Sequence, residues 1–296
     1  MKTILSIDGG GMKGYIPCSV LMALEAKASK PSFDIFDMVA GTSIGGVLAC
    51  LIATGKPANE ALQFFTSDGP KIFGHQQFLG HLGLFRPRYA ASNIESCLNE
   101  RFGGARLYGL KKSLLVTAFD LASYSPVFFK APHGDKNYAL WEVARATSAA
   151  QTYFPAFTLD DMVLWDGGNA VNNPTMCAVA EALRTWPGET LRVLSLGCGS
   201  VASRLPPKVL INAGLVRVGL ETFSLLFDAN DELADYNLRQ VMTSGYYRVT
   251  PKYSVPLSID GCSGRDLSNL YEVSHKCVAD ASKTLDDFLH FKSSQV

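Results

Sequence analysis

A serine in a glycine-flanked turn is the first residue whose type and setting could do chemistry. Ser43 lies in Gly41-Thr42-Ser43-Ile44-Gly45, which matches the pattern G-x-S-x-G. In this pattern the serine occupies a sharp turn from a strand into a helix, and the glycines remove side chains that would clash there. The helix N-terminus also favours negative charge on the serine oxygen. We expect Ser43 to be a nucleophile, with Gly41 and Gly45 supporting the turn.

A serine nucleophile needs a group that accepts its proton, and Asp166 is the strongest candidate. It ends a predicted strand over 162–165 and precedes Gly167 and Gly168. α/β sheets place ligand-facing groups at strand ends, and the two glycines would let Ser43 approach closely. The simpler interpretation of Asp166 is a turn or capping residue.

The common alternative is a triad in which a histidine is the base. None of the five histidines lies at a clear strand end, so each is more typical of a surface or core residue. A histidine-triad esterase that uses His275 or His290 is the first alternative function. The other three are His75, His81 and His133.

A glycine-rich loop, residues 9–14, follows the first predicted strand and matches G-x-G-x-x-G. Dinucleotide-binding folds carry the same pattern, but they place an acidic residue at the end of the second strand, where this chain has Gly41 and Thr42. We therefore favour an oxyanion hole built from backbone N–H groups and the partial positive charge of the next helix. A nucleotide-binding regulatory module without hydrolysis is the second alternative, and a plain tight turn is the third. The expected donors are Gly9, Gly10, Gly11 and Gly14.

Strands and helices alternate along the chain, and these elements must position the candidate groups. This order predicts a three-layer α/β/α fold with a mostly parallel central sheet. The pattern beyond residue 200 is mainly helical. We expect one domain, 1–296, with a motif-bearing core over about 3–200 and a helical C-terminal extension over about 201–296. Predicted strands cover 3–7, 38–40, 113–119, 162–165 and 191–196, and predicted helices include 16–28, 44–54 and 140–150.

The composition argues against several other classes of protein. With 296 residues, of which 47% are hydrophobic, the chain can bury a sizeable core. Lys+Arg and Asp+Glu number 27 each, and this zero net charge disfavours binding to a nucleic acid polymer. The seven cysteines form no C-x-x-C pair, which disfavours a zinc site or disulfide framework. We see neither a signal peptide nor a run of the roughly 20 residues that span a bilayer. We expect a cytoplasmic protein without metal or cofactor.

The three motifs, in this order, resemble the patatin-like phospholipase family. The resemblance runs from about residue 3 to 200. It implies a Ser43–Asp166 dyad without histidine, oxyanion donors at Gly10 and Gly11, and deacylation of phospholipids, galactolipids or neutral glycerolipids without a metal. Lys13 stands where the family commonly has Arg, and Lys cannot form the planar fork of Arg. The matching stretches are 8–14, 33–37, 41–46, 146–150, 153–155, 166–168, 172–174 and 194–197.

The chain also resembles bacterial patatin-like phospholipase effectors that cyclic nucleotides switch on in antiphage defence. This similarity implies a cyclic nucleotide activator beside a membrane phospholipid substrate, with peripheral contact at the inner face of the membrane. No residue pattern identifies the nucleotide site. The surface cations to consider are Lys208, Arg217 and Arg248.

An apolar cluster just before Arg86 and Arg88 has two interpretations. It is either a mobile lid that contacts lipid, with the arginines near headgroups, or a loop packed into the core. The cluster contains Phe73, Phe78, Leu79, Leu82, Leu84 and Phe85.

Overall fold

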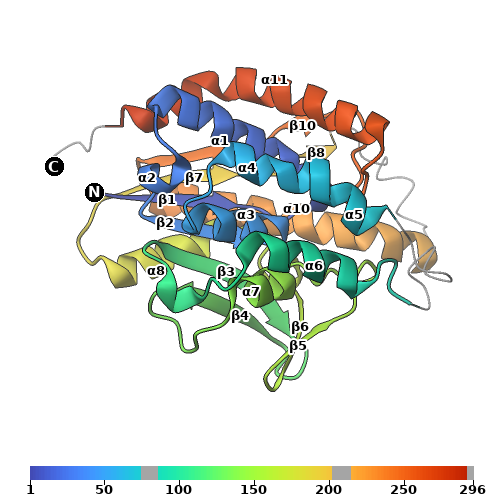
Figure 1. Ribbon diagram of the computed structural model, residues 1–296. Helices are drawn as coiled ribbons and strands as arrows, with labels where there is room; N and C mark the ends of the chain where they lie inside the picture. Colours follow the sequence, from blue (N-terminus) through green and yellow to red (C-terminus); the bar gives the residue numbers. More distant parts are fainter. Residues whose placement is uncertain (75–85, 202–214, 292–296) are drawn as a thin grey trace.

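A central β-sheet organises the protein, which is seen here in a computed structural model. Residues 1–74, 86–201 and 215–291 are described, with only the backbone for 215–224. The sheet has eight strands in the order β5-β6-β3-β2-β1-β7-β9, with β4 paired to β3 (Figure 1). They are β1 (Lys2–Ile7), β2 (Met38–Thr42), β3 (Ser113–Asp120), β4 (Ser125–Ala131), β5 (Phe157–Leu159), β6 (Met162–Asp166), β7 (Leu191–Leu196) and β9 (Tyr246–Val249).

The sheet divides into a parallel part and an antiparallel part. The parallel part consists of neighbouring strands in the order β3, β2, β1, β7 and β9. In the antiparallel part, β4 and β6 run antiparallel to β3, and β5 runs antiparallel to β6. A second, two-stranded sheet joins β8 (Ser200–Val201) to β10 (Lys252–Tyr253). The predicted α/β fold with a mostly parallel central sheet is confirmed.

Helices cover both faces of the sheet, because its parallel strands are apolar on both sides. Leu5 and Ile7 of β1 pack in the larger core with α1, α3, α7 and α11, whereas Ile4 packs in a second core with α8 and α10. The helices are α1 (Tyr15–Ala28), α2 (Ser32–Ile35), α3 (Ile44–Ala53), α4 (Ala58–Gln63), α5 (Gly69–Phe73), α6 (Ala91–Phe102), α7 (Leu140–Thr147), α8 (Thr175–Thr185), α10 (Leu215–Val241) and α11 (Gly264–Leu289).

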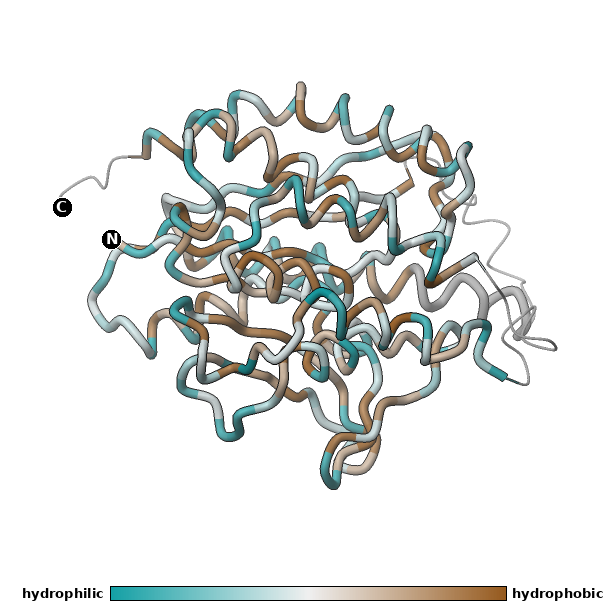
Figure 2. Tube along the Cα trace, in the orientation of Figure 1, coloured by the Kyte–Doolittle hydropathy of each residue, from teal (hydrophilic) through white to brown (hydrophobic). Residues whose placement is uncertain are grey.

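Helix α3 is buried along its whole length, as its apolar sequence predicts. Figure 2 shows hydrophobic residues gathered in the middle of the molecule around this helix. In the described part of the chain, no helix is both long and apolar enough to cross a membrane.

The edge of β3 that faces β2 is shared by two strands. β4 pairs with β3 from Leu114 to Asp120 on one edge, so β2 and β6 must both use the other. β2 ends with Thr42 opposite Thr117, and β6 arrives from the opposite direction and ends with Asp166 opposite the next residue, Ala118. The ends of β2 and β6 therefore meet at adjacent positions on β3.

This arrangement accounts for the position of Asp166. The sequence interpretation placed Asp166 at a strand end and gave the strand no direction; the structure shows that this strand, β6, is antiparallel to β3. Asp166 faces the end of β2 because two opposed strands terminate there, an arrangement that the local sequence does not encode.

The segment beyond residue 200 contributes a strand to the central sheet in addition to its helices. Its strand β9 pairs with β7 and extends the central sheet, α10 packs against α8, and α11 lies along α1 at the outside (Figure 1). The sequence interpretation missed β9, because Tyr246–Val249 is short and carries a charged residue, Arg248, whose burial depends on a distant partner.

Candidate active site

Ser43 occupies a strained turn between β2 and α3. Its φ of 54° and ψ of −126° are uncommon for a residue with a side chain. The turn is so tight that a Cβ added at Gly41 would lie 2.0 Å from the carbonyl oxygen of Gly45. A Cβ added at Gly45 would lie 2.2 Å from the carbonyl oxygen of Ile7. Both positions require glycine, and the turn leaves Ser43 at the N-terminus of a buried helix.

The Ser43 hydroxyl donates a hydrogen bond to Asp166. The distance from Ser43 Oγ to Asp166 Oδ2 is 2.6 Å, although the two residues are 123 positions apart. The other carboxylate oxygen, Oδ1, accepts the N–H of Gly168 at 2.8 Å. Burial raises the pKa of Asp166 to about 6, and the hydrogen bonds from Ser43 and Gly168 oppose that rise. The carboxylate is thus mostly ionised at neutral pH and able to accept a proton.

Threonines hold the turn around Ser43. Its backbone N–H donates to Thr147 Oγ1 at the end of α7, at 2.8 Å. The neighbouring Thr42 hydroxyl lies 2.7 Å from Thr117 Oγ1 and 2.7 Å from the carbonyl oxygen of Val171. A Cβ added at Gly167 would lie 2.1 Å from the Thr117 hydroxyl, so the chain after Asp166 packs tightly against β3.

In the glycine-rich loop, residues 9–14, one of the four expected oxyanion donors already has an acceptor within the protein. The N–H of Gly9 already donates to the carbonyl oxygen of Asn172 at 3.2 Å. Gly14 packs against α3, since a Cβ there would lie 2.7 Å from Ile44. Within the described residues, the N–H groups of Gly10 and Gly11 have no acceptor in the protein. Gly9 instead provides a close approach, because its added Cβ would lie 3.2 Å from Ser43 Cβ.

A buried ion pair supports this loop from behind. Asp8 precedes Gly9 and is fully buried, and both of its oxygens bind Arg248 of β9 at 3.0 and 2.5 Å. Arg248 also donates to Ser195 Oγ at 2.8 Å. Arg248 was a surface candidate for nucleotide binding. That expectation is wrong, because its side chain is only 6% exposed and is already engaged.

The C-terminal segment also closes over the glycine-rich loop. The carbonyl oxygen of Ile259 accepts the N–H of Met12 at 2.7 Å. Gly11 has a φ of +58°, and a Cβ there would lie 2.3 Å from the same oxygen. The next residue, Asp260, accepts hydrogen bonds from Arg88 and from the Tyr89 hydroxyl at 2.6 and 2.7 Å. These contacts fix where the N–H groups of the loop point.

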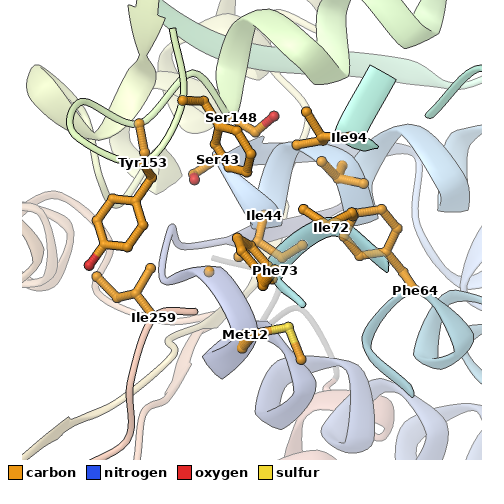
Figure 3. Close-up of a pocket in the computed structure, with 14 residues that line it drawn as sticks. Met12, Ser43, Ile44, Phe64, Ile72, Phe73, Ile94, Ser148, Tyr153 and Ile259 are labelled. Atoms are coloured by element: carbon orange, nitrogen blue, oxygen red, sulfur yellow. The ribbon is translucent and has the colours of Figure 1, made fainter. Parts of the chain in front are cut away.

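An apolar pocket opens beside Ser43. Figure 3 shows Ser43 among side chains from several elements, including Met12 of the glycine-rich loop, Ile44 of α3, Phe73 of α5 and Ile259. The apolar lining of this pocket suits a hydrocarbon chain rather than a charged ligand. The full lining is Gly11, Met12, Ser43, Ile44, Val47, Phe64, Ile72, Phe73, Ile94, Ser148, Ala150, Tyr153, Phe154 and Ile259.

The apolar cluster considered as a lid is seen only in part. Phe73 lines the pocket, whereas Phe78, Leu79, Leu82, Leu84 and Phe85 lie outside the described residues. Arg86 is exposed. Arg88 binds Asp260 and lies over the ring of Tyr153, with its guanidinium carbon 4.9 Å from the ring centre. Arg88 is therefore engaged within the protein.

The histidines in the described part of the chain lie away from the dyad. His133, His275 and His290 are exposed, and none is hydrogen bonded to Ser43 or Asp166. His275 lies on α11, whose buried face packs against α1. His75 and His81 lie outside the described residues, as does Lys208 and the side chain of Arg217.

Several residues that organise the site escaped the sequence analysis. Thr147 and Asn172 lie in stretches quoted for the family resemblance, but nothing local indicated what they touch. No motif marks the residues beyond position 200 that act here, which are Asn230, Asp231 and Ile259. Arg248 was named only as a surface cation and not as the partner of Asp8. Their contacts join segments far apart in the chain, so only a longer-range signal could have found them.

Comparison with known proteins gives consistent results. A family model described as patatin-like phospholipase matches residues 5–179. A "cGAMP-activated phospholipase" of Pseudomonas aeruginosa (strain BWHPSA011 / Pa011) is 30% identical over 267 residues, covering 87% of this chain and 80% of that protein. "Patatin-like protein 2" of Oryza sativa subsp. indica is 33% identical over 248 residues, covering 68% of this chain and 61% of that protein. VipD from Legionella pneumophila is a structural neighbour at 11% sequence identity and a TM-score of 0.45, with 94% of this chain and 67% of that chain covered.

Proposed function

We propose, from the premise that this chain belongs to the patatin-like phospholipase family, that it deacylates membrane glycerophospholipids through Ser43 and Asp166. Family membership makes the chain a lipid acyl hydrolase, which is a carboxylic ester hydrolase. The mechanism and the substrate class are our inference. The observation that carries it is the 2.6 Å hydrogen bond from Ser43 Oγ to a buried carboxylate with a pKa of about 6.

The first half of the reaction forms an acyl-enzyme. Asp166 accepts the hydroxyl proton while Ser43 Oγ attacks the ester carbonyl carbon. The negative charge that develops on the carbonyl oxygen is stabilised by the N–H groups of Gly10 and Gly11, which have no acceptor among the described residues, and by the N-terminus of α3. The C–O bond then breaks, and Asp166 returns the proton to the departing lysolipid.

The second half releases the fatty acid. A water molecule attacks the acyl-enzyme and gives its proton to Asp166. The same N–H groups stabilise the second oxyanion, and Ser43 Oγ leaves and recovers the proton. No metal or cofactor takes part in this scheme. The apolar pocket beside Ser43 would hold the acyl chain, and its lining would favour esters of lipids.

We also propose that a cyclic dinucleotide activates the enzyme, as part of antiphage defence. The support is the similarity to the Pseudomonas aeruginosa protein, whose name describes activation by cGAMP. The described residues indicate no site for the activator, so this proposal rests on similarity alone.

A lipid-panel assay tests the proposed function. Wild type, Ser43→Ala and Asp166→Asn are incubated with phospholipid vesicles, with and without cyclic dinucleotides, and released fatty acids are identified by mass spectrometry. We expect release by wild type only, and faster release with an activating nucleotide. Equal release by all three folded proteins would refute the dyad. The same panel includes galactolipids and neutral glycerolipids, which defines the substrate class.

A further inference from the structure

Helix α10 is hydrogen bonded to the segment that carries the catalytic base. The side-chain amide of Asn230 makes two hydrogen bonds to the backbone on either side of Val171. Its Oδ1 accepts the N–H of Asn172 at 2.9 Å, and its Nδ2 donates to the carbonyl oxygen of Ala170 at 2.9 Å. We call residues 166–172 the base loop, since it starts at Asp166. One side chain of α10 therefore fixes the far end of this loop.

The next residue of α10 fixes the orientation of a second amide. Asp231 Oδ1 accepts a hydrogen bond from Asn172 Nδ2 at 2.9 Å, so the amide oxygen of Asn172 must point the other way. That oxygen lies between the two glycine-containing loops. It would be 2.4 Å from a Cβ on Gly9 and 3.2 Å from a Cβ on Gly168.

Residues 170–172, which α10 holds by hydrogen bonds, contact all three catalytic motifs. The carbonyl oxygen of Asn172 accepts the N–H of Gly9, and that of Val171 accepts the hydroxyl of Thr42 beside the nucleophile. Asp166 itself begins the loop. The segment 170–172 is thus the point where the base loop, the glycine-rich loop and the end of β2 are tied together, and α10 holds this point from outside.

We propose that Asn230 and Asp231 are positioning residues that keep Asp166 and the glycine-rich loop in register with Ser43. Neither residue touches the reacting atoms; they act through Asn172 and the backbone of the base loop. This inference rests on the proposed function, since it assumes that Ser43 and Asp166 form the dyad. It gives the helical segment beyond residue 200 an indirect part in catalysis, through the position of the base loop.

The acidic limb of the profile of activity against pH distinguishes a positioning role of Asn230 and Asp231 from a general contribution to the stability of the fold. Hydrogen bonds from Ser43 and Gly168 lower the pKa of Asp166 and oppose the effect of burial. If the base loop shifts, these bonds weaken, so the pKa rises and the limb moves to higher pH. A substitution that only destabilises the fold reduces the amount of active enzyme and leaves the limb in place.

The experiment compares kcat, KM and pH profile on a short-chain ester for wild type, Ser43→Ala, Asn230→Ala, Asp231→Ala and Asp231→Asn. Glu232→Gln, an exposed position on the same helix, is the matched control. We expect kcat to fall 10- to 100-fold in both alanine variants, with KM within about twofold of wild type and the acidic limb moved upward. Asp231→Asn keeps an acceptor for Asn172 and should retain kcat within about threefold. Glu232→Gln should match wild type.

Each outcome bears on one proposal or the other. If Ser43→Ala is inactive but both alanine variants keep wild-type kcat and pH profile, the positioning inference is wrong and the dyad stands. If Ser43→Ala remains active, the proposed function is wrong, and the positioning inference falls with it. If Asn230→Ala does not fold, Asn230→Asp replaces it, because that variant keeps the acceptor for Asn172 and loses only the donor to Ala170. Wild-type kcat in Asn230→Asp would then overturn the inference.

Discussion

Two regions of this protein contribute to the site in different ways. In the proposed mechanism, residues 1–200 supply the reacting groups, each in a motif of a few consecutive residues, such as Gly41 to Gly45. In that mechanism residues 215–291 supply no reacting group, yet they hold the glycine-rich loop through Arg248 and Ile259 and the base loop through Asn230. The comparison teaches that the chemistry of a site can be local in sequence while its geometry is not.

The largest expected effect belongs to the motif-bearing region. In Asp166→Asn, the amide cannot accept the Ser43 proton, so kcat should fall by roughly a thousandfold while the fold is kept. Ester hydrolysis and circular dichroism measure the two quantities. The matched control is Asp161→Asn, an exposed aspartate in the turn before β6, which should behave as wild type. Substantial activity in Asp166→Asn would mean that another base serves Ser43.

The next effect tests the C-terminal region through stability. Arg248→Met leaves the buried Asp8 carboxylate without its partner, which should lower the free energy of unfolding by about 3–5 kcal/mol. Arg239→Met breaks an ion pair with Asp235 at a side chain that is 56% exposed, and should cost about 0–1 kcal/mol. Urea denaturation compares the two. Equal losses would show that the Asp8–Arg248 pair contributes no more than a surface pair.

A third prediction concerns the contact between the two regions at Gly11. A Cβ there meets the carbonyl oxygen of Ile259 and the φ is positive, so Gly11→Ala should displace the oxyanion donors and lower kcat about 10- to 100-fold. Gly104→Ala is the control, because a Cβ at Gly104 meets nothing within 4 Å. Steady-state kinetics and thermal unfolding separate a catalytic loss from a folding defect. Unchanged kcat in folded Gly11→Ala would remove this loop from the mechanism.

The pH dependence of activity tests whether the group that titrates lies in the motif-bearing region or in the C-terminal region. Asp166 must be ionised to act as a base, so activity should be lost as pH falls through about 6, by roughly tenfold per unit below it. Burial, reinforced by the negative charge of Asp8, raises the pKa of Asp231 to about 8. A limb centred near pH 8 that moves in Asp231→Asn would therefore assign the titration to the C-terminal region. Initial rates on a soluble ester between pH 4 and pH 9 decide between the two.

The smallest expected effect is at the exposed histidines of the C-terminal region. His275→Ala and His290→Ala should leave kcat within about twofold of wild type, because both side chains lie on the solvent-exposed surface and neither binds the dyad. A loss of activity in either variant, in a protein that unfolds at the wild-type temperature, would revive the histidine-triad interpretation.

By itself, the sequence determined the parts of this protein that depend on neighbouring residues. It indicated the parallel strands β1, β2, β3 and β7, because each is a short, mostly apolar run, which is typical of a buried strand. It also indicated Ser43, since only glycines at positions 41 and 45 permit so tight a turn. Asp166 was found for its type, its place at a strand end and its glycines, whereas the antiparallel direction of its strand was not predicted.

Only the tertiary structure decided which distant groups meet. The end-to-end approach of β2 and β6 on β3, the occupied N–H of Gly9 and the hydrogen bonds of Asn230 to the base loop all join residues more than 40 positions apart. A hydrogen bond between such residues depends on the packing of whole elements. Local propensity and hydrophobic periodicity carry no information about that packing.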